Sequence, residues 1–181
     1  MIYIILVVFL FLICILLIWF CFYVVVSCFF PNKRAPFVPS FDRDLKLMKQ
    51  LNLVKWKKII DLWCGNAKAL RFFESEFWLV GDGYDINFFA IVLAKIFNRI
   101  GRYKIRVFWK NFFKADLKKY DYIYVFLFPW QLDNIADWIR ENMKNDCVVI
   151  SNSFEFKKRK PFELIKNKKW YGKIYLYKKN Q

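Results

Sequence analysis

Apolar side chains fill the first part of the chain without interruption by charge. Residues 2–30 contain no Asp, Glu, Lys or Arg, and Ser27 is their only clearly polar residue. A helix of this length reaches roughly 43 Å at about 1.5 Å per residue, whereas the hydrocarbon core of a bilayer is about 30 Å thick. No basic residue precedes the run and no small-residue cleavage site follows it, which disfavours a cleaved signal peptide. The pattern predicts a single transmembrane helix over residues 1–30.

The residues that flank this helix predict its orientation. Lys33 and Arg34 follow it directly, and no Lys or Arg precedes it. Because loops rich in Lys and Arg stay on the cytoplasmic side, we expect a single-pass membrane protein with the rest of the chain in the cytoplasm. Prolines at positions 31, 36 and 39 favour an extended path, so we interpret residues 31–40 as a linker. Residues 41–181 are then long enough for one domain.

Beyond the linker, short apolar runs alternate with amphipathic stretches. The apolar runs predict strands at 58–62, 78–86, 105–109, 122–128, 147–151 and 173–177. Apolar residues at helical spacing predict helices at 41–52, 67–76, 88–99 and 132–142, with Ser40 and Asn87 as the caps of the first and the third. Near-continuous apolar strands separated by helices are typical of an α/β protein with a Rossmann-like, doubly wound and mostly parallel sheet.

The net charge of this domain indicates which classes of partner it could bind. The chain carries a formal net charge of +16, all of it outside the apolar run. Such a surface attracts anionic lipid head groups, nucleic acid or acidic proteins, although scattered lysines equally suit a merely solvated surface. The sequence contains no His and no Cys-x-x-Cys motif. We therefore expect no metal site and no catalysis that depends on histidine.

Two acidic residues stand where the predicted strands end. Asp61 closes the first strand and Asp85 the second, and Gly65 lies in the turn after the first strand. Ligands of open α/β sheets bind outside the carboxyl ends of the strands. A carboxylate at the first turn would repel the pyrophosphate of a dinucleotide, whereas it suits a cationic sulfonium ligand with an amino-acid tail. Asp85 is placed to accept hydrogen bonds from two ribose hydroxyls.

These acids belong to a longer order of motifs. It reads Pro36-Phe37-Val38-Pro39-Ser40, Ile60-Asp61-Leu62-Trp63-Cys64-Gly65-Asn66-Ala67, Gly83-Tyr84-Asp85-Ile86-Asn87, Asn111-Phe112-Phe113 with Asp116-Leu117 and Tyr120-Asp121, and Leu127-Phe128-Pro129. In this order the chain, over about residues 36–178, resembles class I S-adenosylmethionine-dependent methyltransferases. More closely, it is similar to the small membrane-anchored protein-lysine methyltransferases of mitochondria and their bacterial relatives.

The resemblance implies S-adenosylmethionine as the cofactor and assigns residues to it. The implied cofactor set is Asp61, Trp63, Cys64, Gly65, Asp85, Ile86, Asn111 and Asp116. Within it, Asp61 and Gly65 would hold the methionine end and Asp85 the ribose, with Asn111 and Asp116 near the adenine. The channel for the target amine would be walled by Pro36, Phe37, Val38 and Pro39 and by Leu127, Phe128 and Pro129. No catalytic base is assigned.

The turn after the first strand departs from the family pattern D-x-G-x-G-x-G. Trp63 and Ala67 stand at its first and third glycine positions, where glycine lets the backbone approach a ligand closely. A working site requires Trp63 to rotate outward, as a lid. The alternatives are a degenerate domain that has lost cofactor binding, and a UGA codon translated as Trp in a gene whose host reads it as Gly. The odd ratio of eight Trp to five Gly favours the UGA alternative, and the codon for residue 63 decides it.

Three functions follow from these observations. With the resemblance, the leading hypothesis is N-methylation of lysine on a membrane-associated protein, since an apolar aromatic channel keeps the amine neutral and alignment drives the transfer. A nucleic-acid methyltransferase is the second; the basic charge supports it, but Leu127-Phe128-Pro129 stands where an Asn-Pro-Pro-Tyr-type motif would be. A non-catalytic, membrane-anchored scaffold is the third, supported by Trp63 and Ala67 alone.

Overall fold

A computed structural model describes residues 2–29, 40–167 and 172–180 of the chain. It contains two compact units, Met1–Phe37 and Val38–Gln181. The predicted channel segment Pro36 to Pro39 and all of the predicted linker except Ser40 lie outside the described residues.

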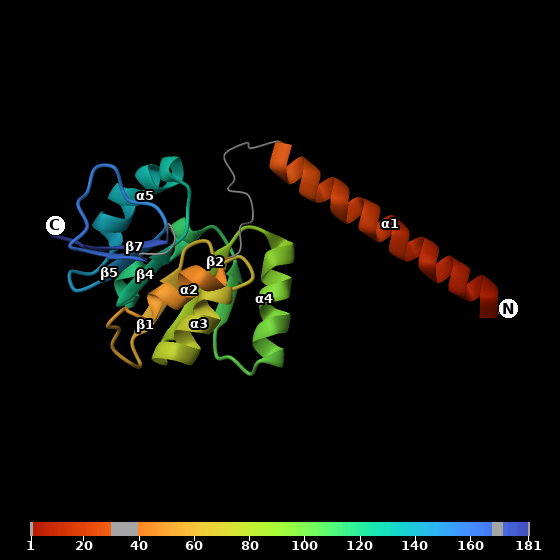
Figure 1. The fold of residues 1–181 in the computed structure, drawn as a ribbon, viewed down its shortest axis with the longest axis horizontal. Coiled ribbons are helices and arrows are strands. Elements are labelled where there is room, and N and C mark those ends of the chain that lie inside the picture. The colour runs from red at the N-terminus through yellow and green to blue at the C-terminus, as the bar shows by residue number, and fades with distance from the viewer. Residues whose placement is uncertain (1, 30–39, 168–171, 181) are drawn as a thin grey trace. The chain divides into compact units, whose positions relative to one another are not determined.

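The first unit contains one long helix. α1 spans Ile2–Phe29, and its part from Tyr3 to Val24 is long and apolar enough to cross a membrane (Figure 1). Apolar side chains are exposed on all sides of that part, as a helix in lipid requires. The predicted helix is confirmed, whereas the membrane itself and the side on which the second unit lies stay predictions.

The second unit is built on a seven-stranded sheet with the order β3-β2-β1-β4-β5-β7-β6. Its strands are β1 Lys58–Asp61, β2 Val80–Asp85, β3 Arg106–Trp109, β4 Tyr122–Val125, β5 Val148–Asn152, β6 Glu163–Lys166 and β7 Lys173–Lys178. β1 to β5 run parallel, and β7 pairs antiparallel with both β5 and β6. This sheet is the predicted Rossmann-like, mostly parallel one, and its strand order reverses between β1 and β4.

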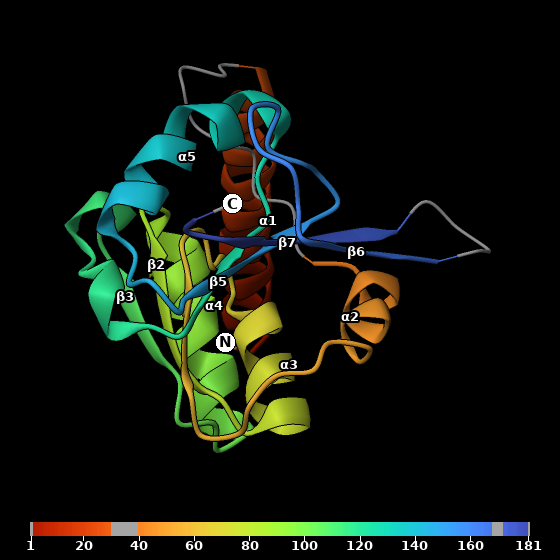
Figure 2. The ribbon, with the colours of Figure 1, turned by 90° about the vertical axis from the view of Figure 1, so that its left-hand side faces the viewer.

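Helices cover both faces of the sheet. They are α2 Asp42–Met48, α3 Lys68–Phe77, α4 Phe88–Ile100 and α5 Pro129–Asn142, with 3₁₀ turns at η1 Phe112–Lys114 and η2 Leu117–Lys119. Figure 2 shows α3 and α4 on one face and α5 on the other. The core lies between these layers, and its fully buried side chains include Ile59, Ile60, Leu70, Phe73 and Tyr124.

Single residues determine where two of the helices begin. Asn87 caps α4 as predicted, because its side chain accepts a hydrogen bond from the Ala90 N–H at 3.2 Å. α5 begins at Pro129 rather than at residue 132. Proline suits a first helical turn, since its fixed φ matches a helix and its missing N–H is not needed there. β4 accordingly ends at Val125 rather than at residue 128.

Two predictions about α2 are also wrong. Ser40 does not cap α2, since Phe41 precedes that helix and the Ser40 hydroxyl hydrogen-bonds the Tyr124 hydroxyl instead, at 3.3 Å. The helix also stops at Met48 rather than at residue 52. The sequence pattern missed β6, because this edge strand buries only Ile165 and carries charged residues at both ends.

Candidate functional site

The carboxyl ends of β1 and β2 lie side by side, next to the point where the strand order reverses. The two strands are parallel, and Asp61 pairs with Gly83 in their register. On its other side β1 pairs with β4, where Asp61 lies opposite Tyr124. Ligands of open α/β sheets bind at such a switch point. The sheet therefore brings Asp61 and Asp85 to the expected binding edge.

Both carboxylates hold the turn that follows β1. Asp61 Oδ1 accepts a hydrogen bond from the Trp63 N–H at 3.0 Å. Asp85 Oδ2 accepts one from the Gly65 N–H at 2.9 Å, and its Oδ1 accepts one from the Asn87 N–H at 2.7 Å. Gly65 has a φ of 52°, a conformation that glycine adopts readily. The structure thus brings four predicted residues together at this turn, Asp61, Trp63, Gly65 and Asp85, and each carboxylate oxygen keeps a lone pair for a further donor.

Burial sets the electrostatics of this pair of acids. Asp61 and Asp85 are only 3% and 4% exposed. Burial raises the pKa of Asp61 to about 7; the hydrogen bond from Trp63 opposes this rise, and the charge of Asp85 adds to it. Burial also raises the pKa of Asp85, against hydrogen bonds from Asn87 and Gly65. Two desolvated acids favour a ligand that brings positive charge or hydroxyl donors, and they disfavour an anion.

Cys64 serves packing at this site. Burial, followed by the charges of Asp61 and Asp85, raises the pKa of its thiol well above the ordinary value, so the thiol stays protonated and unreactive. Its backbone N–H donates to the Tyr84 carbonyl at 3.0 Å, which ties the turn to β2. A Cβ on Gly83 would lie 2.7 Å from both the Cβ and the Sγ of Cys64. Only glycine at position 83 allows this approach.

The two departures from the family turn differ in their local structure. The half-buried Trp63 packs its indole against Phe112, with ring centroids 5.4 Å apart. Phe112 also contacts Phe113 and Trp138, so the indole joins an aromatic cluster beside the segment predicted to meet the adenine. Ala67 has a φ of 60° and so takes the left-handed conformation that glycine would supply. This conformation costs a non-glycine residue on the order of 1 kcal/mol.

The residues predicted to meet the adenine are exposed and cap short turns. Asn111 begins η1, and its side chain accepts a backbone hydrogen bond at 3.0 Å. Asp116 precedes η2, and its Oδ1 accepts a hydrogen bond from the Lys118 N–H at 3.3 Å. The carbonyl of Ile86 accepts a hydrogen bond from the Trp109 indole at 2.9 Å, which links the ends of β2 and β3. Among the described residues, no hydrogen bond or ion pair joins Asp116 to the two buried acids.

Three of the residues predicted to wall the target channel are described. Leu127 is buried in the core, whereas Phe128 and Pro129 reach the surface where β4 leads into α5. Phe128 stacks on the exposed Trp130, with centroids 4.6 Å apart and 4° between the rings, and it also contacts Phe154. We refer to Phe128, Trp130 and Phe154 as the aromatic lip. It lies beyond the carboxyl ends of β4 and β5.

Sequence reasoning missed a buried polar group at the same edge. The Tyr124 hydroxyl lies 3.3 Å from Ser40 Oγ and accepts a hydrogen bond from Asn152 Nδ2 at 3.1 Å. Asp44 of α2 is also buried, and burial raises its pKa against Arg43 and a hydrogen bond with Asn152. Asn152 ends β5 as the two acids end β1 and β2. Extending the same strand-end rule to the fifth strand would have found it.

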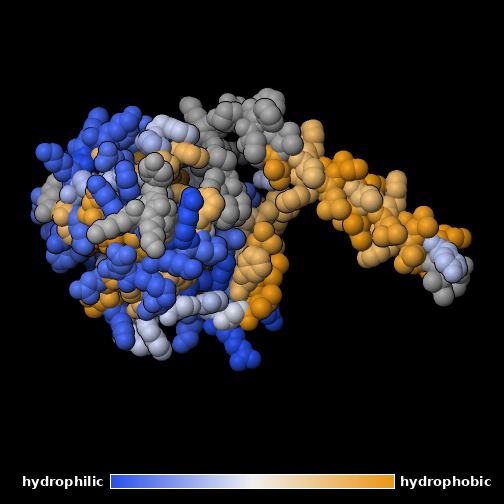
Figure 3. Space-filling view, in the orientation of Figure 1, coloured by the Kyte–Doolittle hydropathy of each residue, from blue (hydrophilic) through white to orange (hydrophobic). Residues whose placement is uncertain are grey.

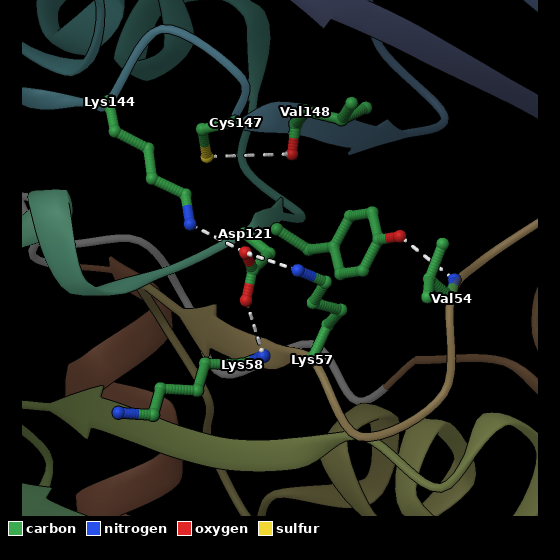
Figure 4. A network of polar contacts seen from close by, with 8 residues as sticks. Val54, Lys57, Lys58, Asp121, Lys144, Cys147 and Val148 are labelled. Carbon is green, nitrogen blue, oxygen red and sulfur yellow. Dashed lines mark hydrogen bonds and ion pairs between the residues drawn. The ribbon is translucent and has the colours of Figure 1, made fainter.

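Asp121, which precedes β4, belongs to the opposite edge of the sheet. Its carboxylate accepts a hydrogen bond from the Lys58 N–H at 2.8 Å and pairs with Lys144 at 2.5 Å and Lys57 at 3.7 Å (Figure 4). Burial acts to raise the pKa of Asp121, but the bonds from Lys144 and Lys58 bring it below its usual value. Asp121 therefore ties the start of β4 to the start of β1, away from the candidate site.

The order of the strands, with an antiparallel seventh strand inserted beside the fifth, defines the class I S-adenosylmethionine-dependent methyltransferase fold. An RNA methyltransferase from Salinibacter ruber, in complex with S-adenosyl-L-homocysteine, matches with a TM-score of 0.70 at 14% identity. The match covers 78% of this chain and 93% of that one. At such identity the likeness shows the fold, and it confirms the predicted fold class.

Two further structures share this fold. A ribosomal protein L11 methylase from Lactobacillus delbrueckii subsp. bulgaricus has a TM-score of 0.59 at 13% identity, over 76% of this chain and 78% of that one. A methyltransferase from Geobacter sulfurreducens in complex with S-adenosyl-L-homocysteine has a TM-score of 0.58 at 11% identity, over 72% and 54%. By sequence, the chain matches no family profile and no curated protein.

Proposed function

We propose that the chain is a methyltransferase that binds S-adenosylmethionine at the carboxyl ends of β1 and β2. The observation that carries this proposal is the pair of buried acids, Asp61 and Asp85, that hold the turn through the N–H groups of Trp63 and Gly65. Two fold neighbours were solved with S-adenosyl-L-homocysteine, the demethylated form of this cofactor, which supports the assignment.

Each residue of the turn then has a role toward the cofactor. S-adenosylmethionine supplies an activated methyl group when it is bound. The carboxylate of Asp61 would balance positive charge at the methionine end of the cofactor. The carboxylate of Asp85 would accept hydrogen bonds from the ribose hydroxyls with its remaining lone pairs. Gly65 would allow close approach of the backbone. The main work of the protein is then to align donor and acceptor.

For the acceptor we propose the amine of a lysine side chain. Lysine must lose its proton before it attacks, and an apolar environment lowers its pKa. The aromatic lip offers such an environment, because Phe128 and Trp130 stack face to face and Phe154 lies beside them. Aromatic faces also attract a methylated ammonium group. These features favour an amine over an anionic acceptor at this edge.

We further propose that the target is a membrane-associated protein on the cytoplasmic side. The apolar helix from Tyr3 to Val24 and the basic residues that follow it, Lys33 and Arg34, support this proposal. A nucleic acid is the second candidate acceptor, favoured by the net charge of +16. A non-catalytic scaffold is the third candidate, favoured by the indole of Trp63 beside the predicted adenine segment.

Calorimetric titration of the full chain in detergent micelles with S-adenosylmethionine tests cofactor binding. We expect Asp85→Asn to weaken binding by roughly 10- to 100-fold, because a hydrogen bond to a charged group is worth about 1.5–3 kcal/mol. Asp137→Asn is the control, since it removes an exposed carboxylate on α5 that pairs with Arg140. No detectable binding by either the unmodified chain or Trp63→Gly would defeat both enzyme proposals and favour the scaffold.

A radiolabelled methyl assay then separates the two acceptors. The full chain, in micelles, is incubated with labelled S-adenosylmethionine and either membrane proteins or total RNA. We expect label in protein, recovered as methyl-lysine after hydrolysis. Label in RNA with none in protein would reject the lysine proposal while retaining the methyltransferase.

A further inference from the structure

The outward face of α4 is apolar. The helix packs on the sheet through its buried residues Ala90, Ile91, Ala94 and Asn98. On the other side, Val92, Leu93, Ile96 and Ile100 follow one another at helical spacing and are 37%, 43%, 46% and 75% exposed. We refer to these four residues as the α4 face, and Figure 3 shows apolar side chains gathered along this helix. A helix side that faces solvent is normally polar, so the α4 face marks an interaction surface.

Aromatic side chains extend this surface at the carboxyl edge of the sheet. Phe88, the first residue of α4, contacts Trp109 with ring centroids 5.1 Å apart. Trp109 is exposed, and its indole N–H donates to the Ile86 carbonyl at 2.9 Å. Tryptophans with an apolar body and a satisfied polar tip are enriched where membranes meet water. The apolar surface thus begins at the edge that carries the candidate site.

Basic residues accompany the α4 face within its own segment of the chain, and one acidic residue of α3, Glu74, accepts a hydrogen bond from the Lys104 N–H at the end of that segment. Residues 88–104 contain neither Asp nor Glu, and their four basic residues are Lys95, Arg99, Arg102 and Lys104. All four are exposed, and among the described ion pairs none uses them. An apolar strip edged by exposed cations matches a partner with an apolar interior beneath anionic groups.

We propose that the α4 face lies on an anionic lipid bilayer, with its four apolar side chains toward the acyl chains and the neighbouring cations among the head groups. This inference rests on the proposed membrane attachment through α1. Residues 25–39, between the apolar span and Ser40, reach at most about 50 Å, so they would keep the domain close to the bilayer. A second copy fits less well, because two such faces would bring their cations together.

Fluorescent probes at two exposed positions test the proposal in the full chain. Ile100→Cys and Val54→Cys are labelled with an environment-sensitive dye and reconstituted into vesicles that contain phosphatidylglycerol. Both native side chains are well exposed, at 75% and 58%, and only Ile100 belongs to the α4 face. The unmodified chain gives the labelling background of the native cysteines. We expect nitroxide-bearing lipids to quench the probe at position 100 several-fold more than the probe at position 54.

Each other outcome overturns a defined part of the proposal. Equal quenching at both positions, in a chain that still floats with the vesicles, would reject the α4 contact and leave the membrane attachment standing. Failure of the full chain to float would reject the attachment, and the inference with it. A blue-shifted probe at position 100 without lipid quenching would show that a protein surface, such as a second copy, covers the α4 face instead.

A different observation concerns the tryptophans. Trp56 and Trp78 have φ values of 65° and 58°, in the left-handed region that bulky side chains rarely adopt. Trp78 directly follows α3, and its N–H bonds to the Glu74 carbonyl at 3.0 Å, at the position where helices most often end in glycine. The two indoles contact each other on the surface and are 70% and 53% exposed. Neither one fills the core.

We infer that the gene specifies glycine at positions 56, 63 and 78 through UGA codons. Trp63 stands at a glycine position of the family turn, while Trp56 and Trp78 stand in glycine conformations, and these observations are independent of one another. The chain has 5 Gly in 181 residues, which is under half of the usual share of about 7%, beside 8 Trp. Reassigned codons would account for both numbers.

The three codons test this inference directly. We expect UGA at each, and tryptic peptides of the protein from its own host with the mass of glycine at these positions. UGG at any of them would reject the inference there. In the expressed chain, Trp78→Gly is expected to raise the free energy of unfolding, because the strain of the left-handed backbone is relieved. Trp138→Gly is the contrasting control. Trp138 lies in α5 and packs its ring on Phe112, so its replacement by glycine is expected to lower the free energy of unfolding.

Discussion

Asp61 is charged in a place that disfavours charge. Burial raises its pKa to about 7, above the ordinary value of 3.8. Between these two pH values the folded state binds a proton that the unfolded state has lost. Folding therefore becomes less favourable as the pH rises from about 4 to about 7, and the full penalty is present above that range. The acid is retained against stability, as expected of a residue kept for binding.

Replacing this acid is expected to stabilise the domain in a pH-dependent way. Asp61→Asn keeps an oxygen to accept the Trp63 N–H and removes the buried charge. The melting temperature of the variant should exceed that of the unmodified chain at pH 8, and the difference should shrink toward pH 5. Thermal unfolding at the two pH values measures it, with Asp137→Asn as the exposed control. The same difference at both pH values would contradict a raised pKa.

A methyl group at position 83 is expected to disturb the turn after β1. Gly83→Ala would place its Cβ 2.7 Å from two atoms of Cys64, and overpacking of this kind costs about 1–3 kcal/mol. Denaturant unfolding measures the loss. Adding Cys64→Gly removes both crowded atoms and should restore part of it. No restoration would mean that Leu70, at 2.9 Å, sets the limit instead.

At the scale of elements, the sequence best predicted the strands that are buried on both faces of the sheet. The interior strands β1 and β4 read as apolar runs because helices cover both sides of the sheet. β6 has no such signature, since only Ile165 among its residues is buried. The sequence rule for helix caps predicted Ser40 as the cap of α2, but its hydroxyl hydrogen-bonds the hydroxyl of Tyr124, a residue distant in sequence. Contacts of that kind have no local signal.

In the candidate site, too, the sequence could predict some residues and not others. Asp61 and Asp85 could be found because strand ends in a parallel sheet meet at one edge. Their carboxylates accept hydrogen bonds from backbone N–H groups of the turn that follows β1, which lies at the same edge of the sheet. Tyr124 looked like part of an apolar strand, and its polar role depends on Asn152 and Ser40 from distant segments. The conformation of Trp78 likewise appears only when the backbone is known.

The cap of α4 offers a test at this scale. Asn87→Ala removes the acceptor of the Ala90 N–H and is expected to cost about 1 kcal/mol of stability. Asn87→Asp keeps an acceptor and should stay close to the unmodified chain. Denaturant unfolding compares the two. Equal losses would show that the side-chain acceptor for the Ala90 N–H does not determine the effect, since the backbone bond from Asn87 to Asp85 is kept in both variants.

At the scale of the whole molecule, the two units are expected to separate in function. The second unit has its own sheet and core, so removal of residues 1–30 should leave S-adenosylmethionine binding unchanged. If the proposed membrane attachment selects the target, methylation of the native membrane protein should be lost. Calorimetry and the radiolabel assay on membranes measure the two effects. Equal methylation by the truncated chain would show that the helix is only a tether.

The bond between Ser40 and Tyr124 gives the chain a mechanical property. Ser40 is the first described residue of the second unit, and its hydroxyl contacts a tyrosine of β4, the middle strand of the sheet. The same tyrosine pairs in register with Asp61 and hydrogen-bonds Asn152. A pull on the chain ahead of Ser40 would therefore reach, through this bond, the strand that runs beside Asp61. If the chain ahead of Ser40 is a membrane tether and the strand ends bind the proposed cofactor, force on the tether and occupancy of the site would act on the same few bonds.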